Sequence, residues 1–371
     1  MLKVLTIGTE QKLFQEGSVA RARILSYGSL VDELYIIAFT KASDGFTSFS
    51  IGNTHVYPTG SFSKLLAPYD AWRIALTLKG KGINLVSAQD PFECGLAGLF
   101  SAHALKAKLH IQIHTDFLSP FFARGSILNR LRVFIGLKII SRADCIRVVS
   151  ARIVRSLISR GVKTRSTPIV LPVYVEMTTQ NGSSTFLKEK YPAFSRFLLV
   201  ASRLEPEKNV LMAVESFAKL RKNFNDTALV IVGDGSQRAL LTRRAVALGI
   251  KDSVFFEGWR KNLTPYYESA SLFLSTSDYE GYGMSSVEAL IAGLSLLSTD
   301  AGIISELYEV GAINIVPPRD SESFAKALAW TLENLPRAKE EATLAREKAL
   351  SSLISQEEYL KRYKLAWEEC L

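Results

Sequence analysis

Hydrophobic residues along the chain form short apolar runs that alternate with longer amphipathic stretches. In the first half, five apolar and β-branched runs predict buried strands: residues 1–7, 34–39, 84–87, 110–114 and 145–150. Between these runs lie stretches with helical periodicity: residues 18–27, 65–79, 95–106 and 127–140. Strands that alternate with helices of this length predict βαβ units and a parallel sheet.

The same alternation begins again after a polar patch at residues 178–184. Five further runs predict strands: residues 197–201, 229–232, 254–256, 272–275 and 295–298. We therefore predict two doubly wound, Rossmann-like α/β domains, residues 1–180 and residues 181–345. The segment that follows is rich in charged residues, but it also contains apolar residues at helical spacing. This pattern favours a helix at residues 346–371 that packs back toward the N-terminal domain, and a disordered tail is the alternative.

Length and composition exclude several classes of protein. A chain of 371 residues is too long for a small stapled fold, and 47% hydrophobic with 22% charged residues is typical of globular proteins. No apolar run approaches the ~18 residues of a membrane-spanning helix, and the first residues are too short for a secretory signal, so we expect a cytoplasmic protein. Cys94, Cys145 and Cys370 show no CxxC spacing, and we expect reduced thiols that pack in the interior.

The net charge of +9 is unevenly distributed along the chain. Residues 1–186 contain 22 basic and 11 acidic residues, whereas the remainder contains 23 and 25. Residues 121–165 alone hold 11 basic residues and one acid, Asp144. This segment suggests peripheral attachment to an anionic membrane at the inner face of the cell, and a solvated basic surface is the alternative. Nucleic acid is not expected as a partner, because no recognised binding module accompanies the charge.

The most informative motif is the segment 278–288, where a glycine-rich loop leads from a predicted strand into a predicted helix at residues 285–292. Backbone N–H groups at the positive end of a helix suit an anionic phosphate. Glu280 would lie beside such a ligand, and Glu288 would lie one to two turns inside the helix. The alternative is a glycine turn with one solvated and one capping glutamate.

Two cations follow the first predicted strand of the second half. Arg203 and Lys208 come directly after that strand, where open α/β sheets bind ligands, so they could converge on one anion. The alternative is surface charge paired with Glu205 and Glu207. The next predicted strand ends in the turn Val232-Gly233-Asp234-Gly235, which is a weak signal by itself.

Other catalytic classes lack their motifs. The chain contains no GxSxG, no HExxH and no P-loop, and no G-x-G-x-x-G follows its first strand. The four histidines show no ligand spacing, so we expect no metal site. His114 ends a predicted strand, and this position favours a functional role over a structural one.

Taken in order, these segments resemble the retaining GT-B glycosyltransferases of family 4. The resemblance covers almost all of residues 197–328 and rests on these segments: Arg203-Leu204…Lys208-Asn209, Val232-Gly233-Asp234-Gly235, Val254-Phe255-Phe256-Glu257-Gly258, Glu280-Gly281-Tyr282-Gly283…Glu288-Ala289-Leu290 and Gly302…Glu306. It implies an acceptor-binding N-terminal domain and a nucleotide-sugar-binding C-terminal domain that face a central cleft. It further implies a hexosyltransferase that uses a nucleotide-diphosphate sugar and needs neither a metal nor another cofactor.

The resemblance also implies roles for individual residues. Arg203 and Lys208 would hold the donor diphosphate, Glu280 would contact the donor sugar, and these three with His114 form the implied catalytic set. Glu288 would bind the ribose hydroxyls. The other implied donor-side residues are Gly233, Gly235, Trp259, Arg260, Gly281, Tyr282, Gly283 and Met284. On the acceptor side the implied residues are Gly17, His114 and Asp116, where Gly17 stands for the glycine pair of the family.

The implied function is sugar transfer to a glycan or lipid-linked glycan during the synthesis of cell-surface polysaccharide or glycolipid. A nucleotide-sugar 2-epimerase of the same architecture is one alternative, and it would need acid/base residues that face the sugar. A non-catalytic sugar- or nucleotide-binding protein is another. The intact set of cations and paired glutamates argues against this last alternative, because a binding protein need not keep that set.

Overall fold

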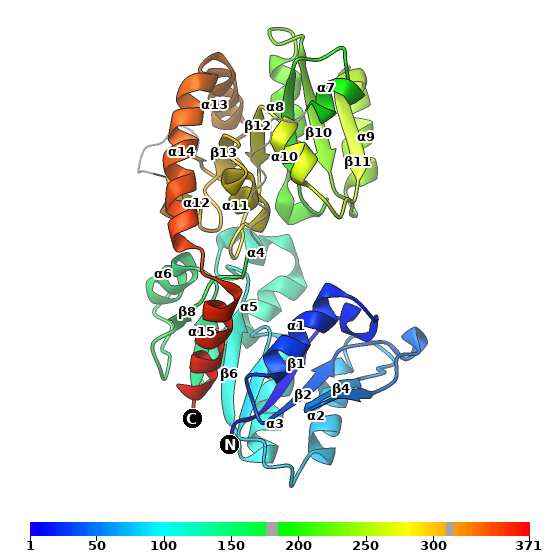
Figure 1. Ribbon diagram of the computed structural model, residues 1–371, viewed down its shortest axis with the longest axis vertical. Coiled ribbons are helices and arrows are strands. Elements are labelled where there is room, and N and C mark those ends of the chain that lie inside the picture. The colour runs from blue at the N-terminus through cyan, green and yellow to red at the C-terminus, as the bar shows by residue number, and fades with distance from the viewer. Residues whose placement is uncertain (176–184, 309–314) are drawn as a thin grey trace. The chain divides into compact units, whose positions relative to one another are not determined.

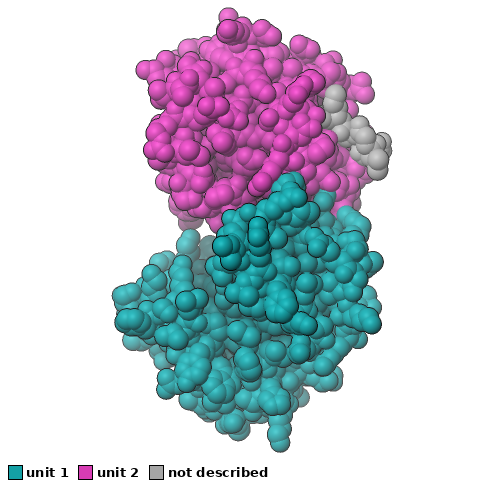
Figure 2. All heavy atoms as spheres, turned by 180° about the vertical axis from the view of Figure 1, so that it is seen from behind, with its two compact units in different colours: residues 1–172, 354–371 teal, residues 173–353 magenta. Residues whose placement is uncertain are grey.

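The structure is a computed structural model that describes residues 1–175, 185–308 and 315–371. Its chain forms two compact units, which Figure 2 colours separately. Unit 1 comprises residues 1–172 and 354–371, and unit 2 comprises residues 173–353. The domain boundary predicted at residues 180 and 181 lies outside the described residues.

Unit 1 is built on a sheet with the strand order β3-β4-β2-β1-β5-β6-β7-β8 (Figure 1). The strands are β1 (Lys3–Gly8), β2 (Glu33–Ala38), β3 (Phe49–Ile51), β4 (Thr54–Pro58), β5 (Leu85–Ala88), β6 (Lys108–Ile113), β7 (Cys145–Val148) and β8 (Ile169–Val170). Neighbouring strands are parallel except β3 and β4. The antiparallel β3–β4 pair was not among the predicted strands.

Helices connect these parallel strands, as the alternating pattern predicts. They are α1 (Val19–Gly28), α2 (Ala67–Thr77), α3 (Glu93–Leu105), α4 (Pro120–Gly125), α5 (Ile127–Ile140) and α6 (Ala151–Ser159). A further helix of unit 1, α15 (Gln356–Glu368), comes from the C-terminal part of the chain and connects no strands. Ser18, Ser126 and Ser355 begin α1, α5 and α15, and each side chain accepts a hydrogen bond from a backbone N–H of the first turn.

The C-terminal helix α15 belongs to unit 1 (Figure 1), and its aromatic residues pack there. Trp367 is fully buried, and the ring of Tyr363 stacks on that of Tyr27 at 4.5 Å between centroids. Cys370 and Cys145 form a disulfide, with their Cα atoms 5.5 Å apart, while Cys94 is free and buried. The prediction of three reduced thiols was therefore wrong for two of them, because helix packing joins cysteines 225 residues apart in the sequence.

Unit 2 is built on a parallel sheet with the order β11-β10-β9-β12-β13-β14. Its strands are β9 (Arg196–Ala201), β10 (Thr227–Val232), β11 (Val254–Gly258), β12 (Leu272–Ser275), β13 (Leu296–Thr299) and β14 (Ile315–Val316). Its helices are α7 (Phe186–Lys190), α8 (Val210–Leu220), α9 (Arg238–Ala247), α10 (Thr264–Ser269), α11 (Met284–Ile291), α12 (Ile304–Leu307), α13 (Ser321–Glu333) and α14 (Leu335–Ser352).

One core of unit 2 lies between this sheet and helices α8, α9 and α13. Alternate residues of each central strand point into it, as Leu198 and Val200 of β9 do, because strand side chains repeat with a period of two. Phe217 of α8 and Phe324 of α13 are buried against them, and each such side chain contributes ~1.5–3 kcal/mol. This burial fixes which loops emerge at the carboxyl edge of the sheet.

The strand order of unit 2 reverses direction between β9 and β12, which are neighbours in the sheet although β10 and β11 separate them in sequence. Open α/β sheets bind ligands at such a switch point, outside the carboxyl ends of the strands. The predicted fold class, two doubly wound parallel α/β sheets, is confirmed. No helix within the described ranges is long and apolar enough to span a membrane.

Candidate functional site

The loops that follow β9 and β12 meet at the switch point of unit 2 through an ion pair. Lys208 Nζ contacts Oε1 of Glu280, although the two residues are 72 positions apart in the sequence. Ser277 Oγ donates a hydrogen bond of 2.8 Å to the same carboxylate oxygen. Only 15% of the Lys208 side chain and 19% of the Glu280 side chain are exposed. The structure thus joins two motifs that the sequence presents separately.

Further hydrogen bonds tie these two loops together independently of that ion pair. Thr276 Oγ1 donates to the carbonyl oxygen of Lys208 at 3.0 Å, and the backbone N–H of Asp278 donates to that of Glu207 at 2.8 Å. Asn209 Nδ2 donates to Oδ1 of Asp278 at 3.1 Å. The backbone positions of the β9 and β12 loops are therefore fixed by more than their charges.

Arg203 and Lys208 bind different carboxylates in the free protein. Arg203 Nη2 lies 3.0 Å from Oε1 of Glu207, and 70% of its side chain is exposed. A third cation, Arg319, contacts Oδ2 of Asp278 with Nε at 2.9 Å and Nη2 at 2.6 Å. Arg319 was not among the predicted site residues, because it lies in the loop before α13 and belongs to no motif. Each of these cations holds a carboxylate of its own.

Glu288 lies in the second turn of α11, and its carboxylate accepts a hydrogen bond of 3.0 Å from the hydroxyl of Tyr267. Desolvation raises the pKa of Glu288 above its ordinary value, and the hydrogen bond from Tyr267 partly opposes this shift. Gly283 begins the helix with a φ of +93°, which L side chains rarely adopt. Gly281 and Tyr282 are buried, and Met284 is the first residue of α11.

Gly233 and Gly235 let the loop after β10 approach the loop after β9. A Cβ atom at Gly233 would lie 1.8 Å from the carbonyl oxygen of Ser202, and one at Gly235 would lie 2.5 Å from that of Leu204. Any larger side chain would therefore push the two backbones apart. In this part of unit 2 the glycine turn is required by packing, which is a role that its sequence alone does not reveal.

Trp259 and Arg260 follow β11 at the same edge of the sheet. The Trp259 residue is 67% exposed, whereas Arg260 Nη2 lies 3.1 Å from Oε2 of the buried Glu257. Glu257 also accepts hydrogen bonds from Lys190 at 2.6 Å, from Tyr266 at 2.8 Å and from the hydroxyl of Tyr191. Burial would raise the pKa of Glu257, but the hydrogen bonds outweigh burial and lower it to about 2.

We expect Glu257→Gln to lower the free energy of unfolding by roughly 2 kcal/mol at pH 7, because the charged partners of the carboxylate lose their ion pairs. The loss is no larger because water screens part of the pairing with the partly exposed Lys190. A depressed pKa stabilises the fold above the ordinary value near 4.5, and this contribution is lost as the pH falls toward 2. Urea unfolding between pH 7 and pH 3 measures the effect, with Glu333→Gln, at an exposed glutamate of α13, as control. Equal pH dependence in wild type and Glu257→Gln would contradict the assignment.

In unit 1, His114 directly follows β6, and the residue as a whole is exposed to solvent. His114 Nε2 lies 3.3 Å from Oε1 of Gln112, and Arg147 Nη1 donates to this oxygen at 2.8 Å. Arginine has only donors, so the atom that faces it is the amide oxygen and His114 Nε2 must be the donor. The acceptor nitrogen of the neutral ring is therefore Nδ1.

Several features favour this neutral form of His114. Desolvation and then the positive charges of Arg147 and Arg23 lower the pKa of His114, and solvent contact of the residue screens part of the effect. Gln112 Nε2 also donates to the hydroxyl of Tyr363 at 2.9 Å, so α15 helps to hold the amide in place. Arg147 is buried in this network and is not part of the basic surface that the sequence suggested for residues 121–165.

The other two acceptor-side residues have local roles in unit 1. Gly17 is exposed and precedes Ser18, which caps α1. Asp116 is buried and accepts a hydrogen bond of 3.1 Å from Ser156 of α6, which ties the end of β6 to that helix. Contact of either residue with an acceptor stays a prediction. Over residues 1–175, 185–308 and 315–371, no group of three potential metal ligands comes together.

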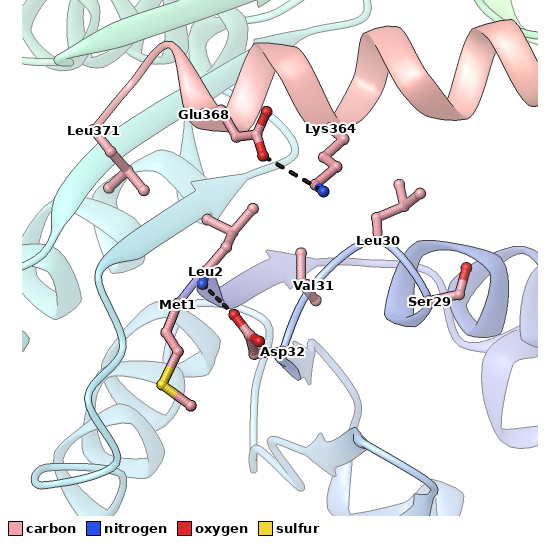
Figure 3. A pocket seen from close by; sticks show the side chains of 9 residues that line it. All are labelled: Met1, Leu2, Ser29, Leu30, Val31, Asp32, Lys364, Glu368 and Leu371. Atoms are coloured by element: carbon pink, nitrogen blue, oxygen red, sulfur yellow. Dashed lines mark hydrogen bonds and ion pairs between the residues drawn. The ribbon is translucent and has the colours of Figure 1, made fainter.

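A separate surface pocket lies where the start of β1 meets α15 (Figure 3). Its lining includes Met1 and Asp32, which precede β1 and β2, and Lys364, whose Nζ lies 3.6 Å from Oε1 of Glu368. The pocket thus lies at the amino edge of the sheet in unit 1. Ligands of open α/β sheets bind at the opposite, carboxyl edge, so we do not assign the site to this pocket.

Comparison with known families matches both halves of the chain. Residues 185–348 match the model described as glycosyl transferases group 1, and residues 33–173 match that described as glycosyltransferase family 4. The alpha-monoglucosyldiacylglycerol synthase of Streptococcus pneumoniae is 26% identical over 229 residues, which are 58% of this chain and 52% of that protein. The lipopolysaccharide core biosynthesis mannosyltransferase LpsB of Rhizobium meliloti is 25% identical over 150 residues, or 38% and 43% of the two chains. The chain thus spans about half the length, or less, of these relatives.

Solved structures share the fold over nearly the whole chain. Sucrose-phosphate synthase from Thermosynechococcus elongatus has a TM-score of 0.80 at 15% identity and covers 100% of this chain and 99% of its own. Anabaena HepE in complex with UDP and glucose has a TM-score of 0.75 at 18% identity and covers 98% of both chains. Together with the two family matches, which fall in both units, these similarities establish that the chain belongs to glycosyltransferase family 4 and has the GT-B fold.

Proposed function

We propose that the protein transfers a hexose from a nucleotide-diphosphate sugar to a glycan or lipid-linked glycan acceptor. The observation that carries this proposal is the convergence of Lys208 and Glu280 at the switch point of unit 2, beside the first turn of α11. Cations and helix N–H groups suit a diphosphate, while carboxylates suit sugar and ribose hydroxyls. Both kinds of group are therefore present at one sheet edge.

In this proposal, departure of the diphosphate is assisted by positive charge. The bond between the anomeric carbon and the diphosphate oxygen breaks, and its electron pair goes to the leaving group. Lys208, Arg203 and the amides around Gly283 and Met284 stabilise the growing negative charge. Glu288 holds the ribose, and Trp259 and Arg260 lie toward the base.

We propose that transfer retains the anomeric configuration. The acceptor hydroxyl oxygen bonds to the anomeric carbon on the face that the diphosphate leaves, and its proton passes to a diphosphate oxygen. Glu280 holds sugar hydroxyls, because its carboxylate already binds Lys208 and Ser277 and is a poor nucleophile in that state. His114, with its acceptor nitrogen at Nδ1, accepts a hydrogen bond from a hydroxyl on the acceptor side.

The names of related proteins support the choice of donor and acceptor classes. Anabaena HepE has been solved with UDP-glucose, and the Streptococcus pneumoniae relative is named for a glucosyl-diacylglycerol product. LpsB is named for the lipopolysaccharide core. We therefore place this protein in the synthesis of cell-surface polysaccharide or glycolipid. A 2-epimerase would consume donor without an acceptor, and a binding protein would not consume it at all.

The direct test of donor binding is a thermal-shift screen with UDP, GDP, ADP, CDP and dTDP and their glucose or mannose conjugates. At a ligand concentration of 100 Kd, binding to the native state alone adds ~2.7 kcal/mol, so a bound donor raises Tm. We expect one nucleoside to stabilise the protein both as diphosphate and as sugar conjugate. A protein that none of these ligands stabilises would refute the proposed function.

We expect activity to persist in EDTA, because cations of the chain take the place of a divalent ion at the diphosphate. Turnover would be measured after dialysis against EDTA, with and without added Mg²⁺ or Mn²⁺. Rates within about twofold of one another are expected. A chelated enzyme that is inactive until Mn²⁺ is restored would contradict a metal-independent mechanism.

We further propose that unit 1 attaches the protein to an anionic membrane at the inner face of the cell. Helix α5 exposes Ile127, Leu131 and Phe134 at spacings of four and three residues, with 84%, 51% and 60% of each residue exposed. These positions lie on one face of the helix, together with the exposed Lys138. Apolar side chains next to a cation favour binding to an anionic lipid surface, where the apolar groups leave water and the cation approaches negative headgroups.

Sedimentation with vesicles tests this attachment at low and moderate salt. We expect binding to vesicles that contain anionic lipid, weaker binding at the higher salt and none to neutral vesicles, because the Debye length shortens with ionic strength. Leu131→Ser with Phe134→Ser should reduce binding, whereas Leu344→Ser, an exposed leucine of unit 2, should not. No sedimentation with anionic vesicles at low salt would defeat the membrane proposal and leave the transferase proposal intact.

A further inference from the structure

The proposed diphosphate site carries its own anions. Lys208 binds Glu280, Arg203 binds Glu207 and Arg319 binds Asp278. The pairs differ in burial, since 70% of the Arg203 side chain and 50% of the Arg319 side chain are exposed but only 15% of that of Lys208. Water screens the two exposed cations, whereas Lys208 depends on Glu280 for its neutralisation.

A diphosphate that binds Lys208 must therefore compete with a carboxylate that is already there. Glu280 cannot move away freely, because Ser277 Oγ donates a hydrogen bond to the same oxygen that Lys208 binds. Diphosphate and Glu280 carry the same sign of charge, so their proximity to one cation costs free energy. A nucleoside diphosphate without a sugar has no sugar hydroxyl that could donate a hydrogen bond to Glu280.

A nucleotide sugar differs at this point. Sugar hydroxyls donate hydrogen bonds, and a carboxylate that has lost part of its ion pair can accept them. Hydrogen bonds to charged groups are worth more than those between neutral groups. Hydrogen bonds from the sugar of the intact donor thus offset the free energy that Glu280 loses when Lys208 also binds the diphosphate. The free nucleoside diphosphate supplies no such hydrogen bonds.

We propose that Glu280 acts as the internal counter-anion of Lys208 and thereby makes the site favour the nucleotide sugar over the free nucleoside diphosphate. This inference rests on the proposed donor site of unit 2. As a consequence, the product diphosphate dissociates readily, because Glu280 restores its full ion pair with Lys208.

Glu280→Gln tests the proposal, because glutamine keeps the size of the side chain and can still bond Ser277 but removes the negative charge. The β9 and β12 loops keep their mutual hydrogen bonds, including that from Thr276 to the carbonyl oxygen of Lys208. Lys208 is then a mostly buried cation without its carboxylate, which raises the free energy of the unliganded site. A bound diphosphate relieves that cost, but a sugar conjugate at the same time loses the charged acceptor of its sugar hydroxyls, so the net gain falls to the free diphosphate.

The measurement is isothermal titration calorimetry without an acceptor, in EDTA, with UDP, GDP, ADP, CDP and dTDP, each against its glucose or mannose conjugate. For the nucleoside that wild type binds, we expect Glu280→Gln to bind the free diphosphate at least about tenfold more tightly. Its affinity for the sugar conjugate should not rise. Glu280→Asp, which keeps the charge, should restore weak diphosphate binding. Glu207→Gln, at the half-buried partner of the exposed Arg203, should change both affinities by less than about threefold, because water screens Arg203.

Two results would overturn the proposal. One is an unchanged or weaker affinity of folded Glu280→Gln for the free diphosphate, and the other is an equal gain for diphosphate and sugar conjugate. Failure of the donor site gives a different result, because wild type would then bind neither form of any of these nucleosides. The titration of wild type therefore separates the inference from the function on which it rests.

Discussion

Lys208→Ala should lower the rate of sugar transfer roughly 10²–10³-fold in a protein that still folds. The leaving diphosphate would lose the cation that is most shielded from water at the switch point. Loss of one preorganised charge-stabilising group costs about 3–4 kcal/mol in comparable sites. The fold should survive, because Thr276 Oγ1 and the N–H of Asp278 still donate hydrogen bonds to the backbone carbonyl oxygens of residues 208 and 207.

Initial rates at saturating donor measure this effect, and circular dichroism with thermal melting checks the fold. Lys219→Ala is the matched control, because Lys219 is an exposed lysine of α8 in the same unit. We expect this control to retain wild-type rates. Near-normal turnover of a folded Lys208→Ala variant would remove Lys208 from the catalytic set.

Glu288→Ala should weaken the affinity for the donor nucleotide by roughly 10- to 150-fold. A charged acceptor of hydrogen bonds from ribose hydroxyls is worth ~1.5–3 kcal/mol, and its removal leaves those hydroxyls without a partner. Glu288 is half-buried, and the desolvation that follows from this raises its pKa above the ordinary value. A ligand group that donates a hydrogen bond to this partly desolvated carboxylate is therefore favoured.

Titration calorimetry of the nucleoside diphosphate and of its deoxyribose form measures the role of Glu288. Wild type should prefer the ribose form, and Glu288→Ala should bind both forms equally. Glu333→Ala, an exposed glutamate of α13, is the control. Unchanged nucleotide affinity in Glu288→Ala would contradict the assigned ribose contact.

The strands and helices of the parallel sheets could be predicted because each buried strand is a continuous apolar run. β10, from Thr227 to Val232, is buried at every residue, and its sequence shows this directly. The β3–β4 pair was missed because β3 has three residues, two of them exposed, which leaves too little pattern. The hydrophobic pattern of the sequence therefore predicts the buried central strands but not short strands at the edge of the sheet.

The partners of charged residues could not be predicted, because they depend on tertiary packing. Sequence spacing suggested that Lys208 pairs locally with Glu205 or Glu207, or joins Arg203 at an anion, whereas its partner is Glu280 of another loop. Arg147 was counted with a basic surface, but α15 covers it through the hydroxyl of Tyr359. The disulfide between Cys145 and Cys370 likewise arises from helix packing.

The same limit explains why Glu257 was not singled out. Within Val254-Phe255-Phe256-Glu257-Gly258 it reads as one polar residue in a short strand. Its importance comes from Lys190 and Tyr191, which lie more than 60 positions earlier in the chain. Charged residues at the ends of buried strands are the best available signal for such sites, since burial without a partner would cost too much.

Acceptor-dependent consumption of a nucleotide sugar in EDTA tests the central claim most directly. The donor identified by thermal shift would be incubated with wild type, with or without a lipid-linked or free glycan extract, and the anomeric protons would be followed by nuclear magnetic resonance. The proposed function predicts that donor is consumed only with acceptor, that nucleoside diphosphate is released, and that the new linkage keeps the anomeric configuration of the donor. Conversion of the donor to its 2-epimer without acceptor, or no conversion under any condition, would contradict it.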